Sequence, residues 1–539
     1  MRPLCLVGAL LLGVMSAPPA MAQNPIDSIT NFFGGDETEP GDGTAFDDAD
    51  DDSGACGGDG RITLNNARVA QGLGVVDDAA LNAYLNAIMA KLVAASKRPN
   101  CRVTVWVTPH DAPQAIALGD GGVLVTMGFL RNFENEDEAA ALLAHEVSHI
   151  LENHHASDAF VDSQDAFLSG LDSANAAGSV MAQFVDPRLS QGLQDASLAG
   201  GLAFSVSESL IAPAWTRDQE DDADLLGTDL LVRAGYNPRA MAAIMDIIKA
   251  QEANLGKVDA ERERLRTERL NATAIEAAQQ SSTGDIWSIV RSLANVTIVA
   301  IDNASESSKA EHRPAEERKA NINEYVRAHY KKDRRRKFKE QAWLDHVAEG
   351  PSAETFMRYR QAAEARRLIY ADGDIDKAQV LAEQGVTGRF SSHAYPRLAF
   401  SEVQARMGNR DVALVSLMLV MQGDGAPWNI YRSASELHLV ANDDRAAGDV
   451  VTRADESLGH PLGIAPYAIM VFRRLNDDAR VKEYLARCGS EGTRAHLAAC
   501  LDEAGMTNQQ YQQLGLVKQP SGTANQSGET IQKSSKSNR

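Results

Sequence analysis

The stretch 139–155 is the part of the chain that most restricts its fold. It reads His145-Glu146-Val-Ser-His149 inside a run rich in Ala and Leu, with no Gly or Pro, which favours a helix. At 3.6 residues per turn the two histidines lie about 40° apart on one helix face. Two neutral imidazoles so placed can share one tetrahedral zinc ion, and Glu146 can deprotonate a water molecule held beside them. The alternative is a chance match on an ordinary amphipathic helix.

A third protein ligand would distinguish a zinc site from a chance match, and the sequence offers two candidates for it. His155 stands where a longer zinc motif has its last histidine, but Glu152 occupies the position where that motif has a chain-turning Gly. If the helix simply continues, His155 lies about 240° around the axis from His149 and cannot reach the same metal. The other source is the pair Glu220 and Asp224, spaced i, i+4. One carboxylate could ligate zinc while the other accepts the outer N–H of a ligating histidine. Such a pair is otherwise typical of a solvated helix face.

Three separated motifs resemble those of the gluzincin peptidases of the HtpX and CAAX-prenyl-protease type. They are the helix motif at 139–153, Arg217-x-x-Glu220-x-x-Ala-Asp224-x-x-Gly227, and Ala234-Gly-Tyr-Asn-Pro238. A similar strand and turn, at 121–132, precede the first motif, so that the resemblance covers about residues 65–250. One departure is Asp222, where the family more often has Glu.

The resemblance implies one zinc ion per chain, held by His145, His149 and Glu220. Glu146 would act as general base and then as general acid, and Asp224 would orient a ligating histidine, His145 by analogy. In this family an edge strand beside the cleft pairs with extended substrate, and the strand at 122–126 is the candidate.

The segment His312-Arg-Pro314-Ala-Glu-Glu-Arg318 resembles the family's H-P-x-x-x-x-R element, with one extra residue between His and Pro. His312 or Arg318 could return to the cleft and stabilise the transition state, or regulate access to the metal. A surface turn that caps a helix is the alternative.

The first residues read as a secretory signal. Residues 1–22 combine Arg2, a short apolar run and Ala20-Met-Ala22, which predicts cleavage after Ala22 and export, most simply to the periplasm. An acidic linker is expected at 23–60. The net charge of −21 makes nucleic acid an unfavourable partner.

Four cysteines remain after such cleavage, and their order in the chain suggests the pairs Cys56–Cys101 and Cys488–Cys500, although spacing alone does not establish connectivity.

The predicted metallopeptidase domain covers 61–340 and contains a small sheet and an insertion at 251–311. The segment 156–215 must lead the chain back to Glu220. It is rich in Ala, Gly, Ser and Leu and could form a pair of packed helices, a mobile lid, or a surface in peripheral contact with a membrane.

Residues 350–505 contain an internal repeat. The turns that begin at Gly373, Gly408, Asn442 and Asn476 recur every 35, 34 and 34 residues, with Ala five positions later in the first three and Val in the fourth. This is the tetratricopeptide period, which predicts stacked helix pairs that bind extended segments or protein partners. Residues 506–539 read as a disordered tail.

The predicted fold class is α+β, mainly α: a gluzincin domain with a small sheet, followed by an all-α tetratricopeptide-type solenoid. The combination resembles the beta-barrel assembly-enhancing proteases of the Gram-negative periplasm. That resemblance implies an endopeptidase for misfolded or stalled outer-membrane proteins, with repeats that dock substrate or the outer-membrane assembly machinery. The alternative is a chaperone or scaffold for the same assembly whose protease site is silent or tightly gated.

Overall fold

The computed structural model describes residues 56–156, 215–253 and 313–514, except 372 and 424. The predicted signal segment, nearly all of the acidic linker, nearly all of the insertion at 251–311 and most of the tail lie outside the described residues, as does 157–214. Within the described part, no helix has both the length and the apolar character that crossing a membrane requires.

A three-stranded sheet lies in the first part of the chain, with strand order β1-β3-β2. The strands are β1 (Thr104–Thr108), β2 (Ala115–Ala117) and β3 (Gly122–Thr126); β1 runs parallel to β3 and β2 antiparallel to it. β3 therefore has a neighbour on each side, and the expectation that it is the free edge strand is wrong. All five of its residues are buried, as in a central strand, whereas the short β2 forms an edge of the sheet.

Helix α5 (Glu136–Leu151) is the centre of this domain, and every residue from Asp137 to Leu151 is buried. It packs against α3 (Ala79–Ala94), α10 (Arg217–Arg233) and β2. The Asn135 side chain caps its first turn, where three acidic residues complement the positive end of the helix dipole. The helix that carries the two candidate histidines is therefore held rigidly from several sides.

Gly227 allows α10 to approach α5 closely. A Cβ on Gly227 would lie 3.1 Å from the backbone nitrogen of His145, tighter than ordinary van der Waals contact. The glycine in the second motif thus sets the spacing between the two helices. The chain then turns through 234–238 into a helix that runs from 239 to 253, where this described segment ends.

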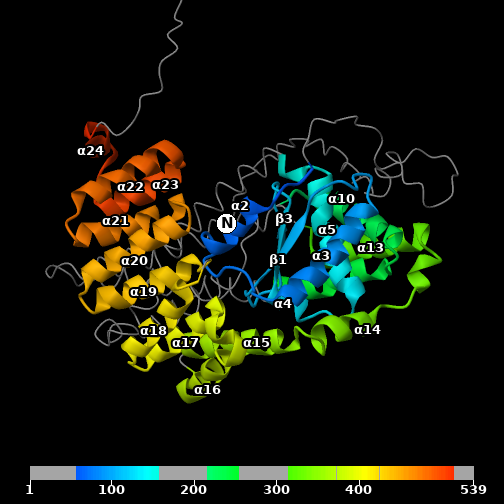
Figure 1. Cartoon of the computed structure of the whole chain (residues 1–539). Coiled ribbons are helices and arrows are strands. Elements are labelled where there is room, and N and C mark those ends of the chain that lie inside the picture. The colour runs from blue at the N-terminus through cyan, green and yellow to red at the C-terminus, as the bar shows by residue number, and fades with distance from the viewer. Residues whose placement is uncertain (1–55, 157–214, 254–312, 372, 424, 515–539) are drawn as a thin grey trace, which may run out of the picture. The chain divides into compact units, whose positions relative to one another are not determined.

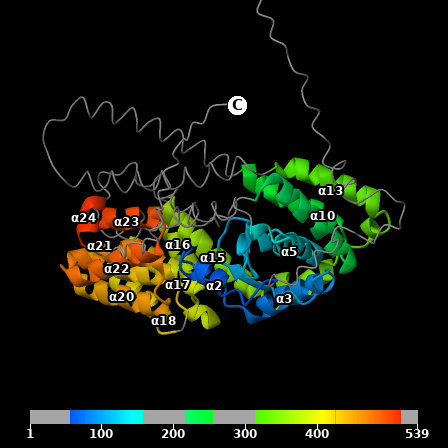
Figure 2. The ribbon, with the colours of Figure 1, turned by 90° about the horizontal axis from the view of Figure 1, so that it is seen from above.

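Helix α13 (Ala315–His329) lies beside α10, and the two run together in Figure 1 and in Figure 2. The smaller elements of the domain are α2 (Arg61–Arg68), α4 (Met127–Leu130), two 3-10 turns at His154–Ala156 and Asp333–Arg335, α14 (Glu340–Trp343) and a π-helical turn at Leu344–Ala348.

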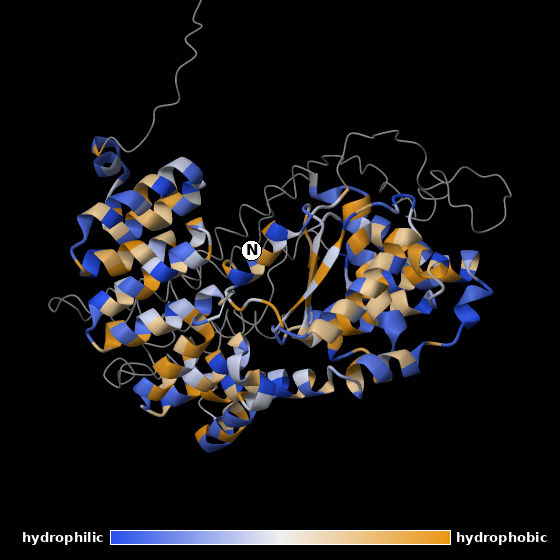
Figure 3. Ribbon diagram, in the orientation of Figure 1, coloured by the Kyte–Doolittle hydropathy of each residue, from blue (hydrophilic) through white to orange (hydrophobic). Residues whose placement is uncertain are grey.

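The rest of the described chain consists of antiparallel helix pairs, here called the hairpin region. Its helices are α15 (Ala353–Tyr370), α16 (Ile375–Gly385), α17 (Ala394–Arg406), α18 (Arg410–Met421), α19 (Trp428–Val440), α20 (Asp444–Ser457), α21 (Ala465–Arg474), α22 (Asp478–Glu491), α23 (Arg494–Ala504) and α24 (Asn508–Gln513). Hydrophobic and hydrophilic residues alternate along these helices, as expected when one face of each helix is buried (Figure 3).

The predicted turns coincide with the turns inside these pairs. Gly408, Asn442 and Asn476 have positive φ angles of 84°, 58° and 56°, which Gly and Asn adopt most readily. A side-chain hydrogen bond also repeats after 34 residues: Ser401 Oγ donates to the Ala413 carbonyl, and Ser435 Oγ to the Ala447 carbonyl. The expected helix pairs and the mainly α fold class are confirmed, while their assignment as tetratricopeptide repeats stays a prediction.

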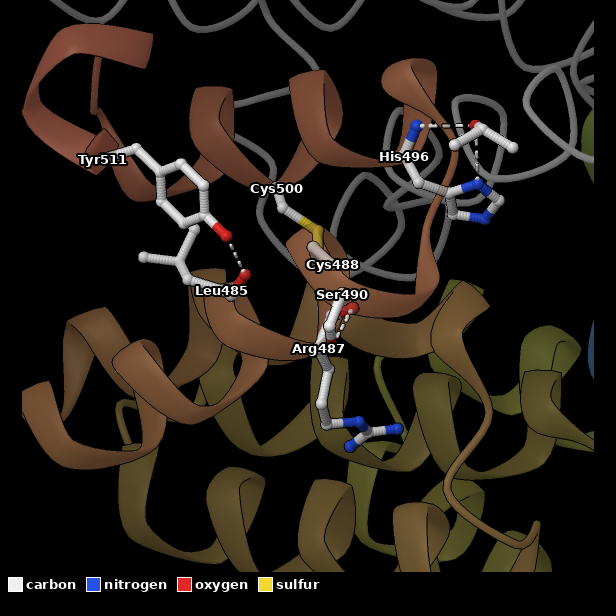
Figure 4. The surroundings of a disulfide bond; sticks show 8 residues. Leu485, Arg487, Cys488, Ser490, His496, Cys500 and Tyr511 are labelled. Atoms are coloured by element: carbon white, nitrogen blue, oxygen red, sulfur yellow. Dashed lines mark hydrogen bonds between the residues drawn. A yellow bond between two sulfur atoms is a disulfide. The ribbon is translucent and has the colours of Figure 1, made fainter. Parts of the chain in front are cut away.

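The cysteines pair as suggested, Cys56 with Cys101 and Cys488 with Cys500. The second disulfide joins α22 to α23, and Figure 4 shows Tyr511 on the following helix with its hydroxyl directed at the Leu485 carbonyl, to which it donates at 3.2 Å. These bonds hold the last helices of the hairpin region together.

Candidate metal centre

The helix α5 presents two imidazole nitrogens to one point. His145 Nε2 and His149 Nε2 lie 3.3 Å apart, and both side chains are buried. Two nitrogens bound tetrahedrally to one zinc ion at about 2.0–2.1 Å are separated by roughly 3.3 Å. The geometry that the i, i+4 spacing predicts is therefore present.

Helix α10 adds a carboxylate to the two imidazoles. Glu220 Oε2 lies 3.6 Å from His145 Nε2, and one donor atom from each of His145, His149 and Glu220 falls within 4.8 Å of the others. A capping box between Thr216 and Gln219 begins α10 immediately before Glu220. Two imidazoles and one carboxylate are a donor set typical of a catalytic metal site, which keeps a further position open.

The outer nitrogen of His145 faces the second carboxylate of α10. Nδ1 lies 3.0 Å from Asp224 Oδ1, so that Asp224 can fix the tautomer in which Nε2 faces the metal position. Between the two acidic residues proposed from the sequence, Glu220 is the one beside Nε2 and Asp224 the one behind the ring.

Arg318, on α13, lies behind these carboxylates. Its guanidinium donates from Nε and Nη2 to the two oxygens of Asp224, at 2.8 and 2.7 Å, and Nη1 lies 2.8 Å from Glu220 Oε2. The side chain is only 6% exposed. Arg318 thus returns to the site, but it pairs with the carboxylates of Glu220 and Asp224. His312, the other residue of that element, lies outside the described residues.

Glu146 lies beside the metal position, and one of its carboxylate oxygens is available to a water molecule or a cation. Among the described residues, its buried Oε2 has no hydrogen-bond partner, while the carboxylate accepts a hydrogen bond from the backbone of Ala117 in β2. A buried carboxylate oxygen without a partner is costly unless a water molecule or a cation completes it. The edge strand and the candidate base are therefore in direct contact.

Burial and charge shift the pKa values of the site. Burial raises the pKa of Glu146 to about 7. Burial lowers the pKa of His145, but the Asp224 and Glu220 carboxylates outweigh it and the pKa is raised. Burial and the neighbouring His145 hold the pKa of His149 well below its usual value. Burial raises the pKa of Asp224, but Arg318 reverses this and lowers it. A metal ion and a proton would compete for His145 Nε2.

Two residues near His149 were missed by the sequence reasoning. His154 Nδ1 lies 2.9 Å from His149 Nδ1, and the Trp215 ring stacks on the His149 ring with centroids 4.2 Å apart. His155, which the sequence offered as a ligand, instead packs against Gly119, where an added Cβ would lie 2.5 Å from its ring. The signal that could have revealed His154 is Asn153, a residue type that often ends a helix in the left-handed conformation.

The model of peptidase family M48 matches residues 79–336. This segment contains all the residues of the site described above, and the resemblance drawn from the three motifs is confirmed over it. This part of the chain is therefore similar to the M48 metallopeptidases.

Similar proteins include the beta-barrel assembly-enhancing proteases of Escherichia coli (strain K12), 26% identical over 172 residues, and of Yersinia pestis, 28% identical over 183 residues. These alignments cover 32% and 34% of this chain, and 33% and 36% of the relatives. The mitochondrial metalloendopeptidase OMA1 of Schizosaccharomyces pombe is 25% identical over 175 residues, which cover 32% of this chain and 46% of that protein. The chain thus spans about a third of the length of the bacterial relatives it matches.

Proposed function

We propose that the chain is a zinc-dependent endopeptidase. The observation that carries this proposal is the convergence of His145, His149 and Glu220 on one point, beside a carboxylate oxygen of Glu146 that has no partner among the residues the structure describes. Purely structural zinc sites use four protein ligands and have no need of a general base. Three ligands with an adjacent base favour hydrolysis.

Each residue has a distinct part in that reaction. Zinc bound by His145, His149 and Glu220 would polarise the peptide carbonyl and make a water molecule more acidic. Glu146 would take a proton from the attacking water and pass it to the leaving amine. Asp224 would hold the His145 ring in orientation through its Nδ1–H, and Arg318 would balance the charge of the two α10 carboxylates.

The edge strand β2 would bind the substrate. Strand β3 is paired on both sides, whereas β2 pairs within the described residues with β3 alone, and it contacts Glu146 through Ala117. An extended peptide that adds to this edge would place a peptide bond close to the general base. This binding mode selects unfolded or extended chains over compact ones.

The substrate class proposed is misfolded or stalled outer-membrane protein in the periplasm. The names of the bacterial relatives support a role connected with β-barrel assembly. Two disulfides, Cys56–Cys101 and Cys488–Cys500, support an oxidising compartment, because such bonds are rare in the cytosol.

The hairpin region would dock the substrate or the assembly machinery as a tetratricopeptide-type solenoid. Helix α18 supports this with four exposed apolar side chains on one face, Val412, Val415, Met418 and Leu419, which are 40–57% exposed. The same observation favours the second candidate function, a chaperone or scaffold with a silent or gated protease site. The endopeptidase requires Glu146 for its function, whereas the chaperone or scaffold does not.

The test is degradation of an unfolded outer-membrane β-barrel by the wild-type protein and by Glu146→Gln, with zinc content measured on both. Glu152→Gln is a matched control, because Glu152 is an exposed residue just past the end of the same helix. We expect cleavage by wild type and control, and zinc without cleavage for Glu146→Gln. If none of them cleaves although each holds one zinc ion, the scaffold function is favoured. If wild type holds no zinc, the ligand set is wrong.

A further inference from the structure

We propose that His154 is a positioning residue for the metal site: its Nδ1 accepts the Nδ1 proton of His149 and so keeps His149 Nε2 directed at the metal. The inference rests on the proposed zinc site. The two Nδ1 atoms are 2.9 Å apart, which is hydrogen-bond distance. The structure thus gives each ligating histidine its own partner, Asp224 for His145 and His154 for His149.

The protonation of both rings follows from this geometry. His149 Nε2 lies 3.3 Å from His145 Nε2 at the metal position, so its lone pair must be free for the metal. The proton of neutral His149 is then on Nδ1 and is donated to His154 Nδ1. His154 can accept it only with a lone pair on Nδ1, so its own proton must be on Nε2. One hydrogen bond therefore sets the tautomer of both rings.

The local chain conformation brings His154 back onto His149. Helix α5 ends at Leu151, and Asn153 adopts a left-handed conformation with φ 55°, which reverses the chain. Gln219 then donates from Nε2 to the His154 carbonyl at 3.2 Å. Gln219 directly precedes Glu220, so the helix that supplies the third ligand also holds the turn that carries His154.

The electrostatics of the site explain why a neutral acceptor suits this position. Three carboxylates already surround the metal position, those of Glu146, Glu220 and Asp224, and Arg318 supplies one positive charge. A divalent cation together with Arg318 balances these three negative charges. A carboxylate behind His149 would add a fourth in a buried site, whereas a neutral imidazole orients the ring without adding charge.

The Trp215 ring, stacked on His149 at an interplanar angle of 12°, covers the same side of the site. It fixes the plane of the His149 ring but offers no acceptor to its Nδ1, since the indole nitrogen only donates. Trp215 thus orients the His149 ring by packing, and His154 selects its tautomer.

Three substitutions test the proposal in the full chain. His154→Ala removes the acceptor. His154→Asn restores one close to the position of Nδ1, whereas His154→Gln places its amide oxygen near the position of Nε2. His155→Ala is the matched control, because it removes the neighbouring histidine ring, which packs on Gly119. The measurements are zinc dissociation constants from chelator competition, and the unfolding midpoints of the zinc-free proteins.

We expect His154→Ala and His154→Gln to bind zinc about 10- to 100-fold more weakly, the usual effect of losing a partner of a ligating histidine. His154→Asn should recover most of that loss, and His155→Ala should match wild type. Equal weakening by Asn and Ala, or wild-type affinity in His154→Ala, would overturn the inference and leave the zinc site intact. A wild-type protein that binds no zinc would overturn the proposed function as well.

A label on histidine nitrogen gives an independent readout. In the zinc-loaded protein, nitrogen NMR should show His149 protonated on Nδ1 and His154 on Nε2. His154 protonated on Nδ1 would contradict the proposal even if its replacement weakened zinc binding, because the ring would then have no lone pair to offer His149.

Discussion

Replacement of Arg318 by Met should destabilise the zinc-free protein far more than the zinc-loaded protein. The guanidinium lies within 2.7–2.8 Å of oxygens of two carboxylates, and all three side chains are at most 6% exposed. Methionine occupies a similar volume without charge. The substitution therefore leaves Asp224 and Glu220 buried without their cation.

The size of the effect follows from these contacts. Removing one partner of a buried ion pair costs about 3–5 kcal/mol, because the remaining charge is uncompensated. We expect a loss of that size in the unfolding free energy of the zinc-free protein. Arg318→Lys keeps the charge but loses the two-pronged contact with Asp224, which should cost about 1.5–3 kcal/mol, the value of one charge-assisted hydrogen bond.

Zinc should recover part of the loss, because it supplies positive charge to Glu220. Folding and zinc binding form a thermodynamic cycle. Each 1.4 kcal/mol of unfolding free energy that zinc restores to Arg318→Met therefore corresponds to about tenfold tighter zinc binding by the variant than by wild type. The measurement is urea unfolding with and without saturating zinc. Lys319→Met is the control: it removes a neighbouring charge whose exposed partner Asp246 lies 2.5 Å away, which should cost only about 0–1 kcal/mol.

Two outcomes would refute this reasoning. If Arg318→Met binds zinc more weakly than wild type, the main effect of Arg318 is to orient Glu220 rather than to balance charge. If the zinc-free variant is as stable as wild type, the two carboxylates are not buried as charged groups, and the ion pair does not stabilise the fold.

Three further predictions concern packing, pH and covalent structure. Gly227→Ala should push α10 away from α5 and weaken zinc binding by at least about tenfold in a chelator competition, since an added Cβ would lie 3.1 Å from the His145 backbone. Burial lowers the pKa of His110 to about 3, so protonation below pH 6.5 favours the unfolded chain. The unfolding free energy should therefore be about 2 kcal/mol lower at pH 5 than at neutral pH. This difference should be smaller in His110→Gln. Replacing Cys488 and Cys500 by Ser should cost about 3 kcal/mol, seen as a lower unfolding temperature, because the disulfide closes a loop of 12 residues; an unchanged temperature would contradict this.

The sequence was most informative where the spacing of residues alone decides geometry. The i, i+4 spacing of His145 and His149 predicts two imidazoles on one face, and the structure has their Nε2 atoms 3.3 Å apart. The 34-residue period predicts the turns at Asn442 and Asn476, because a left-handed turn needs Gly or Asn. Both features depend on local backbone geometry, which is determined by short stretches of sequence.

Features that depend on packing partners could not be obtained in this way. The strand at 122–126 was expected at an edge, but which strand is central depends on its neighbours in the sheet, and β2 at 115–117 is too short to be recognised from its residues. His154 was missed because its position depends on where α5 ends. A continued helix would have carried it away from His149, and the left-handed Asn153 brings it back.

The ion pairs of Arg318 bear on where the metallopeptidase domain ends. The motifs that carry the resemblance stop near residue 250, yet a domain that ended there would leave Glu220 and Asp224 buried without their cation. The backbone nitrogen of Lys339 also donates to the Asp137 carboxylate at 2.6 Å, at the start of the helix that carries the histidines. A folded metal site therefore requires the chain at least as far as α13, and Lys339 adds a contact to the first turn of α5. Residues that lie last in the domain are in this sense part of the site.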